Sequence, residues 1–222
     1  MQANPENRRG PHPKGEADGL EYVDVTSSRY HGLKRALDVL CTLAGLLVLA
    51  LPLLLVMLII YVDDPGPVLF RQYRVGRDGK PFRIFKFRSM RMAAPGNLAT
   101  AAEDPDRYVT RVGRFLRRCS IDELPQLLNV LLGDMSLVGP RPLISDEREV
   151  HELRMRCGVY GVRPGLTGLA QINGRDALSP VEKVRWDTRY LKQFGLWTDI
   201  RILFSTIPKV FDHSAGRKGQ DA

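Results

Sequence analysis

The sequence predicts a small mixed domain of the α/β (α+β) class with an N-terminal re-entrant membrane helix-hairpin. An uncharged apolar run covers residues 39–62. Apolar and basic side chains alternate in residues 68–92 around the turn sequence RVGRDGKPF, which is typical of a β-hairpin. Apolar residues recur at helical spacing in residues 124–132, 180–194 and 196–211. We therefore expect a membrane segment, a β-hairpin and several helices, with the two C-terminal helices amphipathic and interfacial.

The domain organisation follows from length and composition. The 222 residues suit one domain with its own core. Residues 1–32 are rich in proline, glycine and charge, so we expect a disordered tail there and a second one at residues 213–222. The membrane segment is placed at residues 33–65, and the catalytic domain at residues 66–212.

The apolar segment is long enough to cross a bilayer, because 24 residues without a charge form a helix of about 36 Å. Pro52 interrupts the helical hydrogen bonding near its middle. Basic residues flank both ends, Lys34 and Arg35 before it and residues 71–92 after it, and the positive-inside rule places both flanks on the cytoplasmic face. We expect a re-entrant helix kinked at Pro52, with an ordinary spanning helix as the alternative.

The charge of the chain is positive and unevenly distributed. The net charge is +8, and residues 71–92 hold eight Lys or Arg residues against a single acidic residue, Asp78. Such a block suits phosphates of a nucleotide, a nucleic acid or an anionic membrane, although a solvated surface is the structural alternative. The sequence has no nucleic-acid-binding motif and no P-loop, so neither class of protein is indicated.

Three isolated cysteines, Cys41, Cys119 and Cys157, indicate neither a disulfide framework nor a zinc site. A reduced, cytosol-facing domain is the natural inference. Cys119 lies three residues before Asp122, and we interpret it as a buried, inert thiol.

The most informative stretch is residues 119–142, CSIDELPQLLNVLLGDMSLVGPRP. Asp122 and Glu123, called here the carboxylate pair, precede a predicted helix that Gly133 closes. One apolar face is expected from Leu124, Leu127, Leu128, Leu131 and Leu132. Asp122 is expected to cap this helix, an explanation that requires no chemistry, and the positive helix end would keep it ionised as a nucleophile.

The wider sequence resembles the small monotopic phosphoglycosyl transferases, the bacterial sugar transferases of polysaccharide and glycoconjugate assembly. The resemblance covers roughly residues 33 to 212, with its motifs in the family's order. These motifs include DDPGPVLF (63–70), KFRSM (86–90), SIDELPQLLNVLLGDMSLVGPRP (120–142), RPGLTGLAQINGR (163–175) and Asp187 to Tyr190.

The resemblance implies transfer of a sugar 1-phosphate from a UDP-sugar to undecaprenyl (polyprenol) phosphate, with release of UMP. It implies a monotopic enzyme among the lipids of the bacterial inner membrane, on the cytoplasmic face, at the first membrane step of exopolysaccharide or glycoconjugate assembly. Asp122 would be the nucleophile and Glu123 a catalytic ligand of Mg²⁺. Substrate-binding roles are implied for Arg74, Arg88, Arg117, Pro140, Arg141, Pro142 and Asp187.

Two other functions are compatible with part of the sequence. A non-catalytic basic protein that binds membrane surfaces would explain the charge and the apolar segment, but not the carboxylate pair beside Arg141. A membrane hydrolase would use the same Asp122 and transfer the intermediate to water. The sequence indicates neither which UDP-sugar is used nor the oligomeric state.

Overall fold

The computed structural model describes residues 19–93, 105–174 and 177–211, so the predicted C-terminal tail and residues 1–18 lie outside the described part. A long helix, α1 (Tyr30–Asp63), is followed by the hairpin strands β1 (Leu69–Val75) and β2 (Pro81–Phe87). The remaining elements are η3 (Pro105–Tyr108), α3 (Arg111–Arg118), η4 (Ile121–Glu123), α4 (Gln126–Leu132), β3 (Ser136–Val138), α5 (Arg148–Arg156), η5 (Val159–Gly161), β4 (Gly165–Thr167), α6 (Leu169–Ile172), α7 (Pro180–Lys192) and α8 (Leu196–Phe211). The predicted mixture of helices and small sheets is confirmed.

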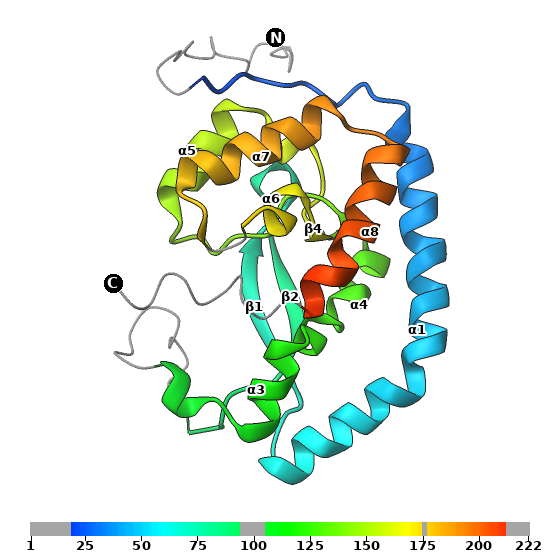
Figure 1. Ribbon diagram of the computed structural model, residues 1–222, viewed down its shortest axis with the longest axis vertical. Coiled ribbons are helices and arrows are strands. Elements are labelled where there is room, and N and C mark those ends of the chain that lie inside the picture. The colour runs from blue at the N-terminus through cyan, green and yellow to red at the C-terminus, as the bar shows by residue number, and fades with distance from the viewer. Residues whose placement is uncertain (1–18, 94–104, 175–176, 212–222) are drawn as a thin grey trace, which may run out of the picture.

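The predicted β-hairpin is present in the middle of the molecule (Figure 1). Its strands are antiparallel, with Leu69 opposite Phe87 and Val75 opposite Pro81. On its buried face, Phe82 and Ile84 pack against residues of α4 and the loop that follows it. The hairpin thus presents its basic residues on a rigid two-stranded support.

A second, parallel pair of strands joins β3 to β4. Gly139 and Gly165 allow this close approach, because a Cβ atom on Gly165 would lie 2.0 Å from the Gly139 nitrogen. The backbone of Pro140–Pro142 is therefore held against the glycine-rich segment 163–168. The short helix α6 follows directly after this segment.

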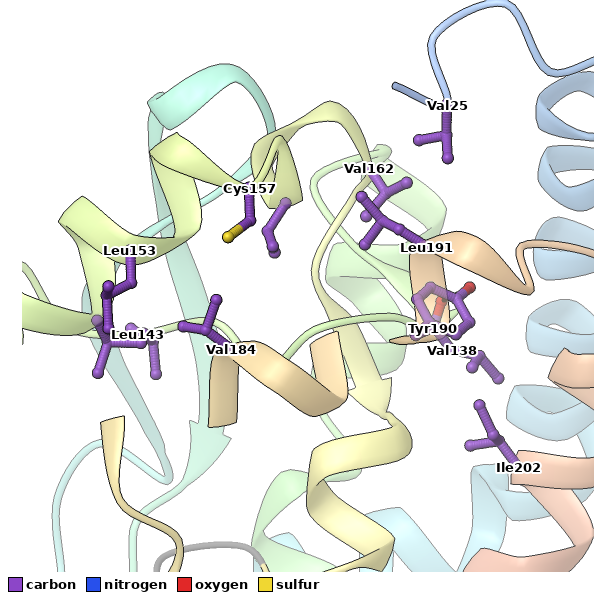
Figure 2. Packing of buried hydrophobic residues seen from close by; sticks show 12 residues of the cluster. Val25, Val138, Leu143, Leu153, Cys157, Val162, Val184, Tyr190, Leu191 and Ile202 are labelled. Carbon is purple, nitrogen blue, oxygen red and sulfur yellow. Dashed lines mark hydrogen bonds between the residues drawn. The ribbon is translucent and has the colours of Figure 1, made fainter. Parts of the chain in front are cut away.

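The main core lies between α5, α7, α8 and β3 (Figure 2). Tyr190 and Leu191 of α7 and Ile202 of α8 are almost fully buried in it. Val25, which is only 7% exposed, packs into the same core, and the Val23 N–H donates to the Cys157 carbonyl at 3.1 Å. The prediction of a disordered tail over residues 1–32 is therefore wrong for its last part, because these apolar side chains have a core to enter.

Helix α1 is one continuous helix of 34 residues with Pro52 inside it. Figure 1 shows it running along one side of the molecule and then bending beneath it toward α3, and a proline is a usual cause of such a bend. Its middle is exposed, with Leu47 81% and Leu51 77% accessible. It is the helix in the described residues with the length and apolar composition to cross a membrane.

Helix α4 buries a different face from the one predicted. Leu127 and Val130 are buried, but Leu128 and Leu132 are exposed, and the polar Asn129 is fully buried. The helix is apolar nearly all round, so its periodicity could not identify the face that packs. Gly133 ends the helix in a left-handed conformation at φ 93°, as predicted.

Candidate active site

The carboxylate pair lies in the short turn η4 between α3 and α4. Helix α3 approaches the end of β2 closely, because a Cβ atom on Gly113 would lie 2.0 Å from the Ser89 carbonyl oxygen. Arg117 of α3 donates from Nε to Ser89 Oγ at 2.8 Å. This packing brings the hairpin strand β2 and the carboxylate pair together.

Asp122 is buried, with 9% of its surface exposed, and does not cap α4, which begins at Gln126 without a side-chain cap. Burial and the negative charge of Glu123 raise its pKa to about 6, against the smaller opposing effects of Lys86 and Arg117. We had expected a helix end to favour the ionised form. The structure corrects this, because desolvation outweighs any helix dipole in a three-residue turn. Asp122 is still mostly ionised at neutral pH.

Glu123 lies between two cations from different parts of the chain. Lys86 Nζ of β2 donates to Glu123 Oε1 at 2.9 Å, and Arg141 Nη2 lies 3.4 Å from the same oxygen. The Glu123 side chain is 13% exposed, so solvent screens these contacts only partly. The carboxylate pair therefore lies in a positive environment able to attract phosphate.

Arg141 is held from behind by a buried ion pair. Arg154 Nη1 donates to the Arg141 carbonyl at 2.8 Å, and Arg154 Nη2 lies 2.7 Å from Asp187 Oδ2. Pro140 and Pro142 on either side of Arg141 are buried. Asp187 is 1% exposed and contacts Arg154, so the structure places it behind Arg141 and not beside the carboxylate pair.

A small polar cavity of about 40 Å³ lies next to this arrangement, lined by Arg141, Glu147, Arg154, Gln171 and Lys183, among others. Gln171 Oε1 is buried and accepts no hydrogen bond within the described residues. The pKa of Arg74 is lowered by burial and by the charge of Arg141, so these two arginines belong to one positive cluster. The cations fit an anionic ligand, and the buried Gln171 oxygen requires a hydrogen-bond donor such as a hydroxyl group or a water molecule.

Arg88 does not join this cluster. It is 9% exposed, donates from Nη2 to the Asp64 carbonyl and lies 3.6 Å from Asp64 Oδ2 at the end of α1. Of the predicted site residues, the structure therefore groups Asp122, Glu123, Arg74, Arg117 and Arg141, with the prolines beside them. Arg88 and Asp187 lie outside this group, because Arg88 contacts the end of α1 and Asp187 contacts Arg154 behind Arg141.

The sequence prediction missed Lys86, Arg154 and Gln171. Lys86 belongs to the quoted KFRSM motif and lies in the predicted hairpin, so its position in a basic strand was the available signal. Arg154 lies in a charged helix and Gln171 in a glycine-rich segment, and neither pattern marks one residue above its neighbours.

The carboxylate pair is compatible with a divalent metal. The described residues contain no group of three or more His, Cys, Asp or Glu side chains placed to hold an ion. Mg²⁺ does not need such a group, because it usually takes one or two carboxylates together with substrate phosphates. Burial is the main cause of the raised pKa of Asp122, and repulsion by Glu123 is the second; a cation beside Glu123 would relieve this second contribution.

The hairpin, the parallel strand pair and the carboxylate pair all lie within one stretch that matches a known protein family. Residues 29–213 match the model of the bacterial sugar transferase family, and the chain belongs to this family.

Three relatives in this family have names that differ in the sugar or in the product that they mention. The UDP-glucose:undecaprenyl-phosphate glucose-1-phosphate transferase of Escherichia coli is 43% identical over 90% of this chain and 46% of its own length. The undecaprenyl-phosphate galactose phosphotransferase of Salmonella typhimurium is 43% identical over 81% of this chain and 40% of its own length. The exopolysaccharide production protein PSS of Rhizobium leguminosarum is 43% identical over 79% of this chain and 93% of its own length. The chain thus spans less than half of two of these relatives.

Proposed function

We propose that this protein transfers a sugar 1-phosphate from a UDP-sugar to undecaprenyl phosphate and releases UMP, as an early step of exopolysaccharide or glycoconjugate assembly. The observation that carries the proposal is the buried carboxylate pair with Lys86, Arg117 and Arg141 around it. The names of the relatives support the acceptor, and they differ in the sugar, so the sugar is left open.

The reaction would proceed in two displacements at one phosphorus atom. An Asp122 carboxylate oxygen attacks the sugar-bearing phosphorus, the bond to the uridine-side phosphate breaks, and UMP leaves with that oxygen. A phosphate oxygen of the acceptor then attacks the same phosphorus and displaces the Asp122 carboxylate. The product is polyprenyl diphosphate sugar, and Asp122 is regenerated.

The cationic residues would bind and orient the donor. Arg141 and Arg74 border the polar cavity or lie close to it, and guanidinium groups bind phosphate oxygens in bidentate fashion. Lys86 and Arg117 flank the carboxylates, where they hold Asp122 ionised against its burial. Glu123 would hold Mg²⁺, which would offset the charge of the diphosphate when bound.

Helix α1 supports a monotopic position on the cytoplasmic face of the inner membrane. Near its start, Lys34 Nζ lies 2.5 Å from Asp199 Oδ2 of α8, and near its end Ile60 is 3% exposed and packs with Phe87 and Leu116. Both ends of α1 therefore contact the same domain. A bent helix that dips into one leaflet with its exposed middle satisfies this arrangement, whereas a straight crossing would separate the two ends.

The decisive experiment compares the wild-type protein with Asp122→Asn. After incubation with UDP-sugar alone, mass spectrometry should find a phosphosugar on the peptide that contains Asp122, and the variant should lose both this adduct and UMP release. Asp78→Asn is the matched control, because Asp78 lies in the exposed hairpin turn at φ 57°, a conformation that asparagine tolerates. Transfer by Asp122→Asn at a rate near that of wild type would exclude Asp122 as the nucleophile.

The competing functions separate in the same assay. A hydrolase would release UMP and sugar phosphate without undecaprenyl phosphate, and a non-catalytic protein would release no UMP. A screen over UDP-glucose, UDP-galactose and their N-acetylated forms, in detergent with Mg²⁺, would identify the sugar.

A further inference from the structure

An apolar pocket of about 290 Å³ lies beside Glu123, between η4, α6, β4 and α8. Its volume is nearly twice that of the roughly 150 Å³ engineered cavities that bind benzene. Apolar side chains line most of it, among them Leu124, Leu137, Leu166, Ile172, Leu203 and Ile207. None of the residues assigned above to the nucleotide, apart from Gln171, lines this pocket.

The two threonine hydroxyl groups in the wall are satisfied within the protein, whereas Gln171 Oε1 has no donor within the described residues. Thr167 Oγ1 and Thr206 Oγ1 are 2.8 Å apart, and Thr206 Oγ1 also donates to the Ile202 carbonyl at 2.7 Å. The hydroxyl groups therefore offer little to a sugar or a nucleotide. A hydrocarbon group is the ligand chemistry that this wall favours.

The two ends of the pocket differ in character. At one end lies Glu123, which contacts Lys86 and Arg141. At α8, the lining residues Leu203 and Ile207 are 38% and 57% exposed, and the exposed Lys209 of the same helix also lines the pocket. The pocket therefore opens to the exterior beside apolar side chains and one cation, as at the boundary between lipid chains and phosphate headgroups. Lys86 and Arg141 do not line the pocket themselves, but both contact Glu123 at its end. A ligand whose chain fills the pocket and leads outward along α8 would bring an anionic head next to Glu123 and these two cations.

We propose that this pocket holds the first isoprene units of the acceptor lipid, with the acceptor phosphate at the carboxylate pair. The inference rests on the proposed function, in which that phosphate attacks the phosphorus held by Asp122. Gln171 lines both this pocket and the polar cavity, so donor and acceptor sites share one wall and meet at the carboxylate pair. The acceptor chain binds on the η4–α8 side and the nucleotide on the Arg141 side.

A first test fills the pocket from α8. Leu203→Trp should raise the KM for undecaprenyl phosphate at least about tenfold, the equivalent of losing roughly two buried methylene groups. It should leave unchanged the exchange of labelled UMP into UDP-sugar, which needs no acceptor. Phe204→Trp is the matched control, because Phe204 is the next residue on α8, is 70% exposed and does not line the pocket.

A second test uses the native thiol of Cys119, which lines the pocket and is partly exposed. In a Cys41→Ser background, the remaining Cys157 is buried, so maleimide labelling reports on Cys119. Undecaprenyl phosphate should slow this labelling severalfold, whereas UMP and inorganic phosphate should not.

The outcomes separate the inference from the function on which it rests. If UMP exchange and transfer proceed but Leu203→Trp leaves the acceptor KM unaltered and Cys119 stays unprotected, the pocket does not hold the acceptor and the proposed function stands. Equal protection by phosphatidylglycerol vesicles without acceptor would assign the pocket to a membrane acyl chain and overturn the inference. Absence of UMP exchange in the wild type would overturn both.

Discussion

At the scale of single residues, Asp122 combines burial with a charge that the proposed reaction needs. Its pKa lies at about 6, above the usual 3.8 of an aspartate, chiefly because the carboxyl group is desolvated. An ionised nucleophile at neutral pH is therefore maintained at a cost to folding, which is common at active sites.

This cost predicts the effect of pH on stability. A carboxyl group whose pKa is raised by folding favours the native state below its unfolded pKa, and this contribution is lost as pH rises through the folded pKa. Asp122→Asn does not titrate, so relative to wild type it should gain roughly 2 kcal/mol of unfolding free energy between pH 4 and pH 8. Thermal unfolding of both proteins in detergent at the two pH values measures this difference. A variant that is equally shifted at both values would contradict the raised pKa.

The second prediction at the residue scale concerns the buried ion pair between Arg154 and Asp187. Asp187→Asn leaves Arg154 buried without its anionic partner and should cost about 3–5 kcal/mol of stability. The double variant Arg154→Met with Asp187→Leu should recover most of that stability, because no buried charge remains. Its KM for UDP-sugar should stay raised, since Arg141 has lost the hydrogen bond to its carbonyl. Full recovery of both thermal stability and KM would refute the positioning role of the pair.

At the scale of elements, one side chain attaches α4 to the hairpin. Asn129 is fully buried, and its Oδ1 accepts from the Phe85 N–H at 3.0 Å. Its Nδ2 donates to the Arg83 carbonyl at 2.7 Å. The Asn129 side chain therefore pairs with the backbone of β2 as a neighbouring strand would. It holds β2, which carries Lys86, against the segment that carries Glu123.

Replacement of this side chain should affect stability and turnover together. Asn129→Leu leaves two backbone groups of β2 unpaired and should cost about 2–4 kcal/mol. It should also lower kcat, because Lys86 and Glu123 lose their register. Asn129→Asp keeps the acceptor for Phe85 and loses the donor for Arg83, so it should fall between the two in melting temperature and kcat. An Asn129→Leu protein with wild-type kcat would show that the hairpin does not position Glu123.

At the scale of the whole molecule, the structure relates the membrane helix to the active site. Asp199 of α8 accepts from Lys34 and Tyr30 of α1 and from Tyr190 of α7. Arg35 donates to the carbonyl groups of residues 130 and 131 at the end of α4. The depth of α1 in a bilayer is therefore linked rigidly to the position of the carboxylate pair.

This link predicts the membrane topology. In a background with the three cysteines replaced by serine, Ser27→Cys before α1 and Lys80→Cys in the hairpin should both react with an impermeant maleimide in inside-out vesicles. Neither should react in sealed right-side-out vesicles. A spanning helix would instead give the two cysteines opposite accessibility.

Much of the fold and part of the site could be predicted from the sequence. The hairpin, α4, α7 and α8 follow from local periodicity and turn residues, and Asp122, Glu123 and Arg141 from one contiguous motif. The buried face of α4 could not be predicted, because Leu128 and Leu132 have the same apolar character as the leucine that packs. The ordered segment around Val25 was missed because a tail of polar composition gives no sign of the core that it meets.

The sequence by itself determined the apolar helix with its proline, the order of the main elements and the identity of the carboxylate pair. Each of these depends on residues that are adjacent in the chain. Only the tertiary structure decided that both ends of α1 lie on one domain, and that Lys86 and Arg141 meet at Glu123. It also decided that Asp122 is desolvated and that an apolar pocket adjoins it. These properties depend on contacts between distant segments and on the exclusion of water, neither of which a local pattern of residues encodes.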